Sequence, residues 1–446
     1  MRERSAGGLR RERKASLWQL VFLMYTITAA GAYGLEEMVG GSGPGITLLI
    51  LILLPFVWAV PLSLASAELT TALPREGGIY SWVREAFGDF WGFQAGWWNL
   101  AANTVNSAAY AVLFTDYLRE YAPAVHGLRH TAVCLGLIWI LVWANVRGIR
   151  TVGMMSLVFT ILCVLPFPIL ALLGAGHWRL DPFTPFLHPD KSPLAALQSG
   201  FFIAIWLYSG YEQLGTVAEE VTEPRRAYPI ALLLVVPAVI LTYVVPTLFA
   251  LASLDGWRGW GENYFITAAQ ALGGPLLAFA MLVGAMISNA ALLNSTLLAT
   301  SRIPFAMARD GLLPGAFART HPVRGTPWVA LVLGGVVFSL LSSLHGFAAL
   351  IAIYAWLEVA SYALVYLALM RLRRSRPDLQ RPYRVPGGRA GLLLVCLPPL
   401  LIAILTIAWG DKQEALSGAI GLLSGPLVFA LWRLLRRWRA HPVPTV

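Results

Sequence analysis

The stretch Ala29-Ala30-Gly31-Ala32-Tyr33-Gly34-Leu35-Glu36-Glu37 decides the fold of this chain. It lies in the outer half of the first apolar run, where two glycines three residues apart are followed by two carboxylates. Glycine inside a helix costs about 1 kcal/mol relative to alanine, so a continuous helix is unfavourable here. Irregular backbone at membrane depth is tolerated only where it lines a cavity or is buried in protein. We therefore expect a helix that breaks here and presents backbone groups to a ligand.

The composition is that of a membrane protein. Of the 446 residues, 57% are hydrophobic and 13% are charged, with a mean hydropathy of +0.66, whereas soluble proteins carry about 25% charged residues. Most of the uncharged runs reach the length of about 20 residues that a helix needs to cross a bilayer. The runs are 15–35, 38–67, 90–115, 151–178, 192–211, 227–254, 263–301, 325–357, 390–410 and 415–432, with a shorter one at 131–146. Since the run from 325 contains a turn and continues into a further span ending near 370, we expect an all-α membrane protein with twelve transmembrane helices.

The basic residues indicate the orientation of the chain. With twelve spans and a cytoplasmic N-terminus, all but six of the 33 lysines and arginines fall on the inner side. The six outer ones are Arg119, Arg129, Arg179, Lys191, Arg258 and Lys412. This is the positive-inside pattern, so we expect a multi-pass protein of the cytoplasmic (inner) membrane with both termini in the cytoplasm. Basic loops beside apolar spans need no nucleic acid to explain them, and we expect no nucleic-acid partner.

A second interruption lies in the sixth span, at Trp206-Leu207-Tyr208-Ser209-Gly210-Tyr211-Glu212-Gln213-Leu214-Gly215. Gly210 follows Gly31 by about 180 residues, which divides the chain into two five-span repeats, 17–175 and 195–372. An odd number of spans inverts the second repeat relative to the first, and paired interruptions in corresponding spans indicate the central site of a transporter. Outside the repeats we expect a cytoplasmic tail over 1–16, two further spans over 390–434 and a second tail over 435–446.

Three carboxylates within the spans are candidates for proton coupling or gating. An ionisable residue inside a membrane is costly and is a functional-site hypothesis by default. Glu36 and Glu212 follow the two interruptions, and Glu358 lies in the tenth span. The alternative for each is a hydrogen-bonded structural role or a position near an interface. Glu219 and Glu220, at a cytoplasmic span end, are expected to anchor a loop or a gate.

Polar and aromatic residues near the interruptions complete the candidate site. They are Asn103, Asn106 and Tyr110 on one face of the third span, Thr296 on the eighth span, and Tyr33, Trp206, Tyr208 and Tyr211 at the interruptions. Aromatic rings there can close over a ligand or stack on a cationic group. Hydrogen bonding between packed spans is the alternative role for the polar side chains.

The sequence predicts neither a cofactor nor a metal. The three cysteines lie inside apolar spans, and neither they nor the seven histidines have metal-ligand spacing. No nucleotide-binding motif is present, so ATP is not expected to drive the protein.

Five motifs occur in order along the chain. They are AYGLEE (32–37), ELTTALPREGG (68–78), FWGFQAGWW (90–98), ARDGLLP (308–314) and RPDLQRPYRVP (376–386). Together with the two interruptions, they resemble the amino acid, polyamine and organocation transporter superfamily. Within it they are similar to the branch that includes the plant-type polyamine uptake transporters, and the resemblance extends from about residue 17 to 435.

The resemblance implies a leucine-transporter-type fold, with two inverted five-helix repeats, two extra helices and a substrate site between the broken first and sixth spans. In amino-acid carriers of this family, the first break holds the substrate carboxylate through backbone amides, and sixth-span carbonyls help to hold the amine. The matching positions here are Gly31, Ala32, Tyr33 and Gly34 in the first span and Tyr208, Ser209, Gly210 and Tyr211 in the sixth. Glu36 and Glu212 resemble the polyamine branch and suit an additional cation on the substrate.

Two departures from the family pattern bear on substrate and coupling. Polyamine carriers place acids on the eighth span, where this chain has Thr296 and Thr300. Sodium-independent members often carry a fifth-span lysine, but the matching region 159–167 contains Cys163 and no lysine. A long polyamine is therefore disfavoured, and the coupling ion stays open, with Glu36 or Glu212 as the groups that would exchange a proton.

These patterns favour a secondary active carrier of an amine-bearing substrate, an amino acid or a small polyamine, that works by alternating access with proton coupling or exchange. A transporter-like receptor would keep the same site and add a signalling tail, and both tails here are short. A membrane-embedded enzyme would need convergent catalytic groups, which the sequence does not offer. A channel would keep a continuous polar lining, which paired broken helices do not require. The particular amine and the oligomeric state stay open.

Overall fold

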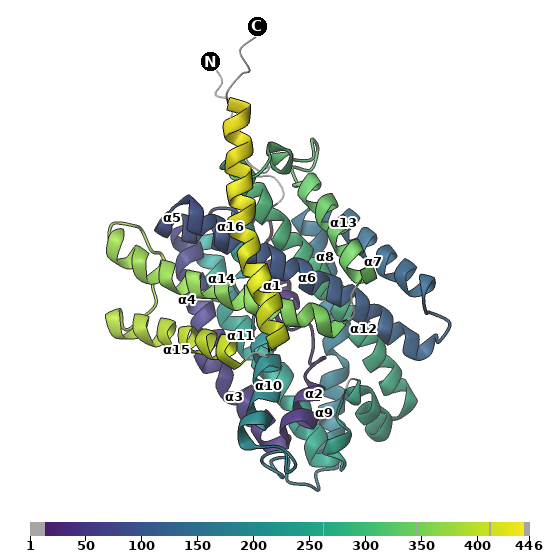
Figure 1. The fold of residues 1–446 in the computed structure, drawn as a ribbon. Helices are drawn as coiled ribbons and strands as arrows, with labels where there is room; N and C mark the ends of the chain where they lie inside the picture. Colours follow the sequence, from purple (N-terminus) through teal and green to yellow (C-terminus); the bar gives the residue numbers. More distant parts are fainter. Residues whose placement is uncertain (1–13, 262, 345–346, 410–411, 441–446) are drawn as a thin grey trace.

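The structure, a computed structural model, describes residues 14–261, 263–344, 347–409 and 412–440, and these residues form helices joined by short connections (Figure 1). The helices are α1 (Leu17–Thr28), α2 (Glu36–Ser42), α3 (Pro44–Val57), α4 (Ala59–Ala72), α5 (Ile79–Phe87), α6 (Asp89–Tyr121), α7 (Leu128–Val146), α8 (Ile149–Val164), α9 (Pro166–Gly176), α10 (Pro193–Leu207), α11 (Pro224–Ser253), α12 (Tyr264–Arg309), α13 (Trp328–Leu344), α14 (Phe347–Ser375), α15 (Gly388–Trp409) and α16 (Lys412–Ala440). Short 3₁₀ segments lie at η2 (Gln213–Glu220), η3 (Trp257–Gly259) and η4 (Gly315–Ala318). The all-α class expected from the sequence is confirmed for the described residues.

Seven segments of the described chain are long and apolar enough to cross a bilayer. They are α3 with α4, α7, α8 with α9, α11, α12, and most of α15 and of α16. Three further apolar helices, α1, α10 and α13, are shorter. Length and composition thus identify a multi-pass membrane protein, without fixing the number of crossings at twelve.

The first helix breaks where the two glycines stand, as predicted. The amides of Ala29 and Ala30 both donate to the carbonyl of Tyr25, 2.9 and 3.3 Å away, which closes α1. Ala30 then has φ +48°, a left-handed conformation that is uncommon for a residue with a side chain. Gly31 and Gly34 follow at φ +102° and +89°, where a Cβ would be strained.

The second span begins later than the apolar run 38–67 predicts. The run 38–67 was expected as one second span, but residues 36–42 form α2, and the chain then turns at Gly43 (φ +100°) into α3. Two glutamates in its first turn favour a helix beginning at Glu36, because carboxylates interact well with the positive end of a helix. The remainder of the run divides at Trp58, since Pro61 cannot supply the hydrogen bond to the carbonyl of Val57.

The sixth span also breaks as predicted. Helix α10 ends at Leu207, residues 208–212 are not helical, and the chain continues only as the 3₁₀ segment η2. Gly210 has φ +101°. Both breaks are buried in the molecule. Residues 29–33 and 208–212 are all buried, and α1 packs against α8, α11 and α12.

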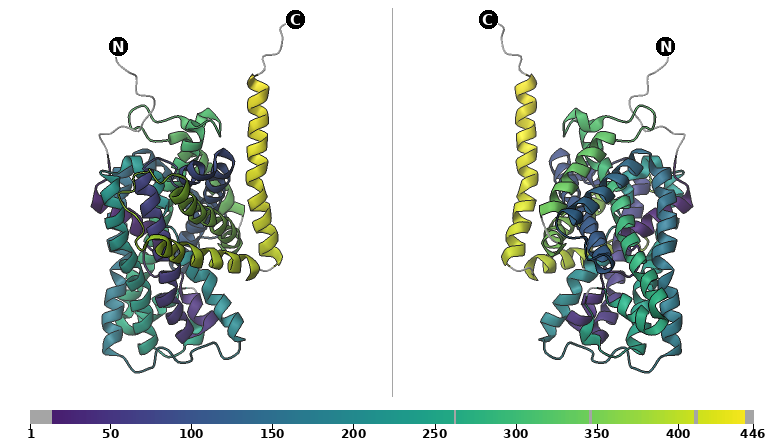
Figure 2. Two further views of the ribbon diagram at one scale, coloured as in Figure 1. Left: turned by 90° about the vertical axis from the view of Figure 1, so that its left-hand side faces the viewer. Right: turned by 90° about the vertical axis from the view of Figure 1, so that its right-hand side faces the viewer.

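The two opposite ends of the molecule, which we call its poles, carry different helices. Helix α16 runs along one side of the molecule (Figure 2), and its C-terminal end lies at the pole opposite to α2 and to the end of α9 (Figure 1). Helix α6 packs against α14, α12 and α5, so that it forms a wall beside the two breaks.

Candidate functional site

The two broken segments contact each other directly. A Cβ on Gly210 would lie 3.0 Å from the carbonyl oxygen of Ile27, so only glycine permits this approach. The hydroxyl of Tyr243, on α11, lies 3.2 Å from the carbonyl oxygen of Thr28 and 3.1 Å from that of Leu207, and can donate to either. These are the final residues of α1 and α10, so one tyrosine holds both helix ends together.

The geometry at these helix ends favours a positive charge. Helices α1 and α10 both end at the breaks, and the C-terminal end of a helix carries unpaired carbonyls and a partial negative charge of about half an elementary charge. Two such ends beside one cavity create a negative potential without a formal charge.

A small central cavity lies between the breaks. Its residues come from α1 and the first break (Ile27, Thr28, Ala29, Tyr33), from α6 (Asn103, Asn106, Tyr110), from α10 and the second break (Trp206, Leu207, Ser209, Gly210, Gln213), and from α11, α12 and α14 (Tyr243, Leu292, Thr296, Tyr354). Its volume of about 30 Å³ is far below the about 300–1,000 Å³ of a typical ligand pocket. The structure therefore shows the site closed, and a substrate needs the surrounding helices to move.

Helix α6 supplies the polar wall of this cavity. The side-chain amide of Asn106 donates to the hydroxyl of Tyr110 at 2.9 Å, and its oxygen accepts a hydrogen bond from the indole of Trp206 at 3.4 Å. The amide of Asn103 donates to the carbonyl oxygen of Asn99 at 2.9 Å. The predicted sharing of one face by Asn103, Asn106 and Tyr110 is confirmed, because all three line the cavity.

Tyr33 and Trp206 separate the central cavity from a second one nearer the pole that carries α2. This outer cavity has a volume of about 50 Å³ and is lined by Tyr33, Gly34, Glu36, Glu37, Leu113, Tyr117, Trp206, Ser288, Asn289 and Leu292. The hydroxyl of Tyr33 donates to the carbonyl of Met281 at 3.1 Å, and a Cβ on Gly34 would lie 3.1 Å from the ring of Trp206. Tyr33 and Trp206 line both cavities together with Leu292. We call these two aromatic residues the outer gate, where outer means only toward the pole that carries α2.

Glu36 belongs to the outer cavity rather than the central one. One of its carboxylate oxygens accepts a hydrogen bond from the amide of Gly34 at 2.8 Å. The other oxygen is buried and has no hydrogen-bond partner among the described residues. The side chain is 2% exposed, so this oxygen is available to a ligand or a proton but is shielded from water.

The other two carboxylates lie together behind the central cavity. Glu358 accepts hydrogen bonds from the side-chain amides of Asn99 at 3.0 Å and Gln213 at 3.4 Å, and the hydroxyl of Tyr354 lies 3.5 Å from it. Glu212 is fully buried, lies close enough to Glu358 for their charges to interact, and makes no hydrogen bond of good geometry within the described chain. Gln213 and Tyr354 also line the cavity, so they connect it to Glu358.

The structure brings about half of the predicted site residues together. Tyr33, Asn103, Asn106, Ser209, Gly210 and Thr296 line the central cavity, while Gly34 and Glu36 join Tyr33 at the outer one. The remaining candidates, Gly31, Ala32, Tyr208, Tyr211, Glu212 and Glu358, line neither of these two cavities. Tyr208 points away because its hydroxyl donates to the carbonyl of Leu51 on α3, at 2.7 Å.

Other residues of the cavity were not among the predicted ones. Tyr243 lies in a largely apolar part of α11 with no charged residue nearby in sequence, and Leu292 is an ordinary apolar residue of α12. Tyr354 precedes Glu358 by one helical turn, a spacing that places both on one helix face and was the only available signal. Gln213 follows Glu212 directly but faces the cavity, since the 3₁₀ geometry of η2 directs the two side chains differently.

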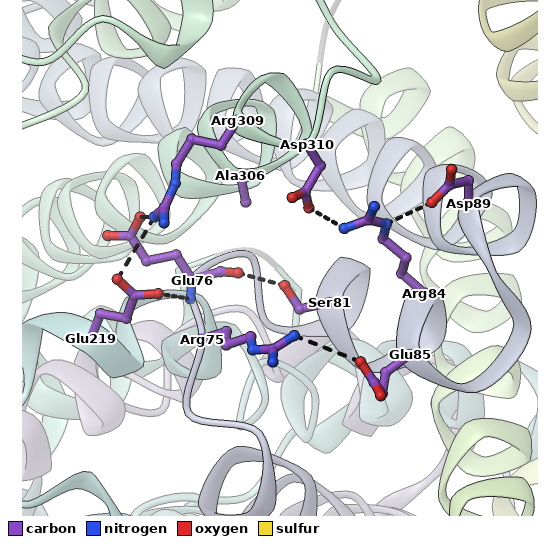
Figure 3. A pocket seen from close by; sticks show the side chains of 10 residues that line it. All are labelled: Arg75, Glu76, Ser81, Arg84, Glu85, Asp89, Glu219, Ala306, Arg309 and Asp310. Carbon is purple, nitrogen blue, oxygen red and sulfur yellow. Dashed lines mark hydrogen bonds and ion pairs between the residues drawn. The ribbon is translucent and has the colours of Figure 1, made fainter. Parts of the chain in front are cut away.

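Ion pairs cover the pole opposite to α2. Figure 3 shows a cavity of about 360 Å³ in which Arg84 lies between Asp310, 2.6 Å away, and Asp89, 2.7 Å away. Across the cavity, Arg309 reaches Glu76 at 3.3 Å and Glu219 at 3.7 Å. These pairs connect α5, α6, η2 and the end of α12.

Two carboxylates at this pole are buried. Glu220 pairs with the fully buried Arg302 of α12 at 2.7 Å, which ties the end of η2 to the core. Glu76 is 3% exposed, and its burial, followed by the nearby charges of Glu220 and Glu219, raises its pKa well above the ordinary value. The prediction that Glu219 and Glu220 anchor this end is consistent with these contacts.

The described residues contain no group of three or more histidine, cysteine or acidic side chains that could hold a metal ion. The three cysteines are free and buried.

The chain is similar to known membrane transport proteins. A family model described as "Amino acid permease" matches residues 16–411. A probable polyamine transporter of Arabidopsis thaliana is 31% identical over 434 residues, covering 96% of this chain and 86% of the relative. A polyamine transporter of Oryza sativa subsp. japonica is 31% identical over 429 residues (93% and 78%), and the human large neutral amino acids transporter small subunit 2 is 26% identical over 403 residues (87% and 74%).

The named relatives are membrane transporters rather than enzymes, in agreement with a multi-pass helical chain whose broken helices surround a closed central cavity. The chain belongs to the amino acid permease family, within the amino acid, polyamine and organocation superfamily. The resemblance drawn from the five motifs is therefore confirmed.

Proposed function

We propose that this protein is a secondary active transporter that moves an amine-bearing substrate, an amino acid or a small polyamine, across the cytoplasmic membrane by alternating access. The observation that carries the proposal is the meeting of two interrupted helices at one closed cavity, with Tyr243 joining their ends. The named relatives, polyamine transporters and a large neutral amino acids transporter, support the substrate class.

The proposed architecture has twelve crossings in the leucine-transporter-type fold. Residues 17–175 and 195–372 would form the inverted repeats, and 390–434 the two additional helices. The excess of basic residues between alternate spans supports an orientation with both termini in the cytoplasm. The ion pairs of Figure 3 would then lie on the cytoplasmic side and Glu36 on the outer side.

The substrate's ammonium group would bind at the ends of α1 and α10. Carbonyl oxygens of Ile27, Thr28 and Leu207 lie at these ends, and the partial negative charge there favours a cation. Asn103, Asn106 and Thr296 would bind the rest of a polar substrate. Glu36, in the outer cavity, would attract a second positive charge or the substrate on its way in.

Proton coupling would run through the buried carboxylates. Glu358 is connected to the cavity through Gln213 and Tyr354, so a bound cation would change the balance between its protonated and ionised forms. Glu212 would take part in the same proton exchange as Glu358, because two buried carboxylates whose charges interact do not both ionise readily. Glu36 is the alternative proton carrier.

The test is uptake of radiolabelled amino acids and polyamines into proteoliposomes with and without an imposed pH gradient. We expect saturable uptake that the gradient accelerates. Glu358→Gln should retain substrate exchange but lose the effect of the gradient, whereas Asp255→Asn, an exposed loop variant, should behave as the original protein. Absence of transport and of competition by any amine or amino acid would refute the substrate class. An unchanged gradient effect in Glu358→Gln, Glu212→Gln and Glu36→Gln alike would refute the coupling groups.

A further inference from the structure

A second large cavity lies at the same pole as the ion pairs of Figure 3, and the function proposed above does not use it. Its volume is about 470 Å³. Its walls are the start of the described chain and α1 (Lys14, Gln19), the start of α8 and the residues before it (Arg147, Gly148, Ile149, Arg150, Thr151, Met154), η2 (Glu219, Glu220) and the segment before α13 (Arg324, Gly325, Thr326).

The positive charges of this cavity are not neutralised. Lys14, Arg147, Arg150 and Arg324 form no ion pair with any carboxylate of the described residues, whereas Arg75, Arg84 and Arg309 of the neighbouring cavity are all paired. The two acids in the wall are already engaged, Glu219 by Arg309 at 3.7 Å and Glu220 by Arg302 at 2.7 Å. With these two carboxylates paired to arginines outside the cavity, the four cations leave its lining positive, which favours an anionic ligand.

Backbone donors lie in the same wall. Helix α8 has 16 residues and begins at Ile149, directly after Gly148 at φ +107°. The first amides of a helix have no partner within it, and with the helix dipole they favour a phosphate or another anion. Ile149 and Arg150 therefore add backbone donors to the four charged side chains.

An apolar surface adjoins the cavity. Met154, in its wall, is 66% exposed, and Val158 and Ile161 on the same face of α8 are each 53% exposed. Trp143 of α7, beneath the guanidinium of Arg147 at 3.9 Å, is also exposed. A soluble anion would use only the charged part, whereas a phospholipid uses both surfaces.

We propose that this cavity binds the phosphate headgroup of an anionic phospholipid, with the acyl chains along the exposed face of α8. Basic pockets between membrane helices suit such headgroups. The bound phosphate would connect the start of α1, η2 and α8. Helix α1 leads into the first break, η2 follows the second, and α8 packs against α1. The lipid would thereby stabilise the closed arrangement of this pole.

The experiment measures lipid binding to the purified full chain in detergent, by native mass spectrometry and by thermal unfolding. Phosphatidylglycerol should bind and raise the unfolding temperature, and phosphatidylcholine with the same acyl chains should not. Arg147→Gln combined with Arg150→Gln should weaken phosphatidylglycerol binding by about 30-fold, since each basic residue near an anionic lipid contributes about a fivefold effect.

The matched control is Arg374→Gln combined with Arg389→Gln, which removes two exposed charges outside this cavity and should leave binding within about twofold. An equal loss in both double variants would mean diffuse electrostatic attraction and would overturn the proposal. The same stabilisation by glycerol phosphate alone would assign a soluble phosphate and overturn the lipid. If the cavity variant does not fold, equal binding of the two lipids to the original protein, or an unaffected Arg324→Gln variant, would also overturn it.

Discussion

Gly34 permits the outer gate to close. Two properties of this position require glycine. Its φ of +89° would strain a residue with a side chain, and an added Cβ would lie 3.1 Å from the Trp206 ring. Gly88 shares the first requirement, with φ +85°, but nothing lies within 4 Å of a Cβ there. Substitutions at Gly34 and Gly88 can therefore separate the effect of backbone strain from the effect of the contact with Trp206.

We predict that Gly34→Ala lowers uptake about tenfold, because the added methyl pushes Trp206 away from Tyr33. Gly88→Ala should cost about 1–2 kcal/mol of stability for its left-handed backbone and leave uptake per folded molecule unchanged. Uptake in proteoliposomes, normalised to folded protein, together with thermal unfolding, measures both. Equal losses of uptake in the two variants would show that the Trp206 contact is irrelevant.

The site residues that could be predicted from the sequence are those whose own residue type changes the local backbone. Gly31 and Gly210 disrupt a helix through their own backbone freedom, so both breaks could be located from the order of residues alone. Tyr243 could not be found in this way, because its role depends on two carbonyls that other segments bring to it. Tyr208 was assigned to the site by its position in the break, but its direction is decided by Leu51, about 160 residues earlier.

Among the elements, α1 and α10 depend on α11 for their relative position. We predict that Tyr243→Phe lowers stability by about 1–3 kcal/mol, since the buried carbonyls of Thr28 and Leu207 lose the single donor that lies between them. Substrate binding should also weaken, because the helix ends separate. Tyr25→Phe is the control, because it removes a hydroxyl contact between α1 and α11. The Tyr25 hydroxyl contacts Thr242 at 2.9 Å, but Thr242 also donates to Ala238, so no backbone carbonyl loses a partner.

Chemical denaturation and ligand-induced thermal shifts distinguish these two variants. Tyr25→Phe should cost about 0.5–1.5 kcal/mol, the net value of one hydrogen bond, and keep the ligand-induced shift. If the two tyrosine variants lose the same stability and the same shift, the bridge between the helix ends has no special role.

At the scale of the whole molecule, the fold class followed from composition, whereas the span boundaries did not. The division at Gly43 and Trp58 depends on how helices pack and on a single proline, while hydropathy reads 38–67 as continuous. Composition alone does not determine the number of membrane crossings, because α6 mixes apolar residues with amides and charges over its 33 residues.

The proposed orientation predicts a labelling pattern with a membrane-impermeant thiol reagent. The three natural cysteines are buried, so they should stay unlabelled in intact cells. Arg129→Cys, in the first turn of α7, should react from outside, and Ser375→Cys, at the last residue of α14, only after the membrane is opened. The reverse pattern would invert the topology, and labelling of both from outside would contradict an odd number of crossings between them.

The closed central cavity has a consequence for the energetics of the cell. With room for only a few atoms between the outer gate and the ion-paired opposite pole, the resting protein offers ions no continuous water-filled route. A transporter that is driven by an ion gradient, as proposed, must not let ions leak through it and dissipate that gradient. A membrane with many copies of this closed form would remain an electrical insulator. In the proposed transporter, the tight contact between the two broken helices would thus help to conserve that gradient.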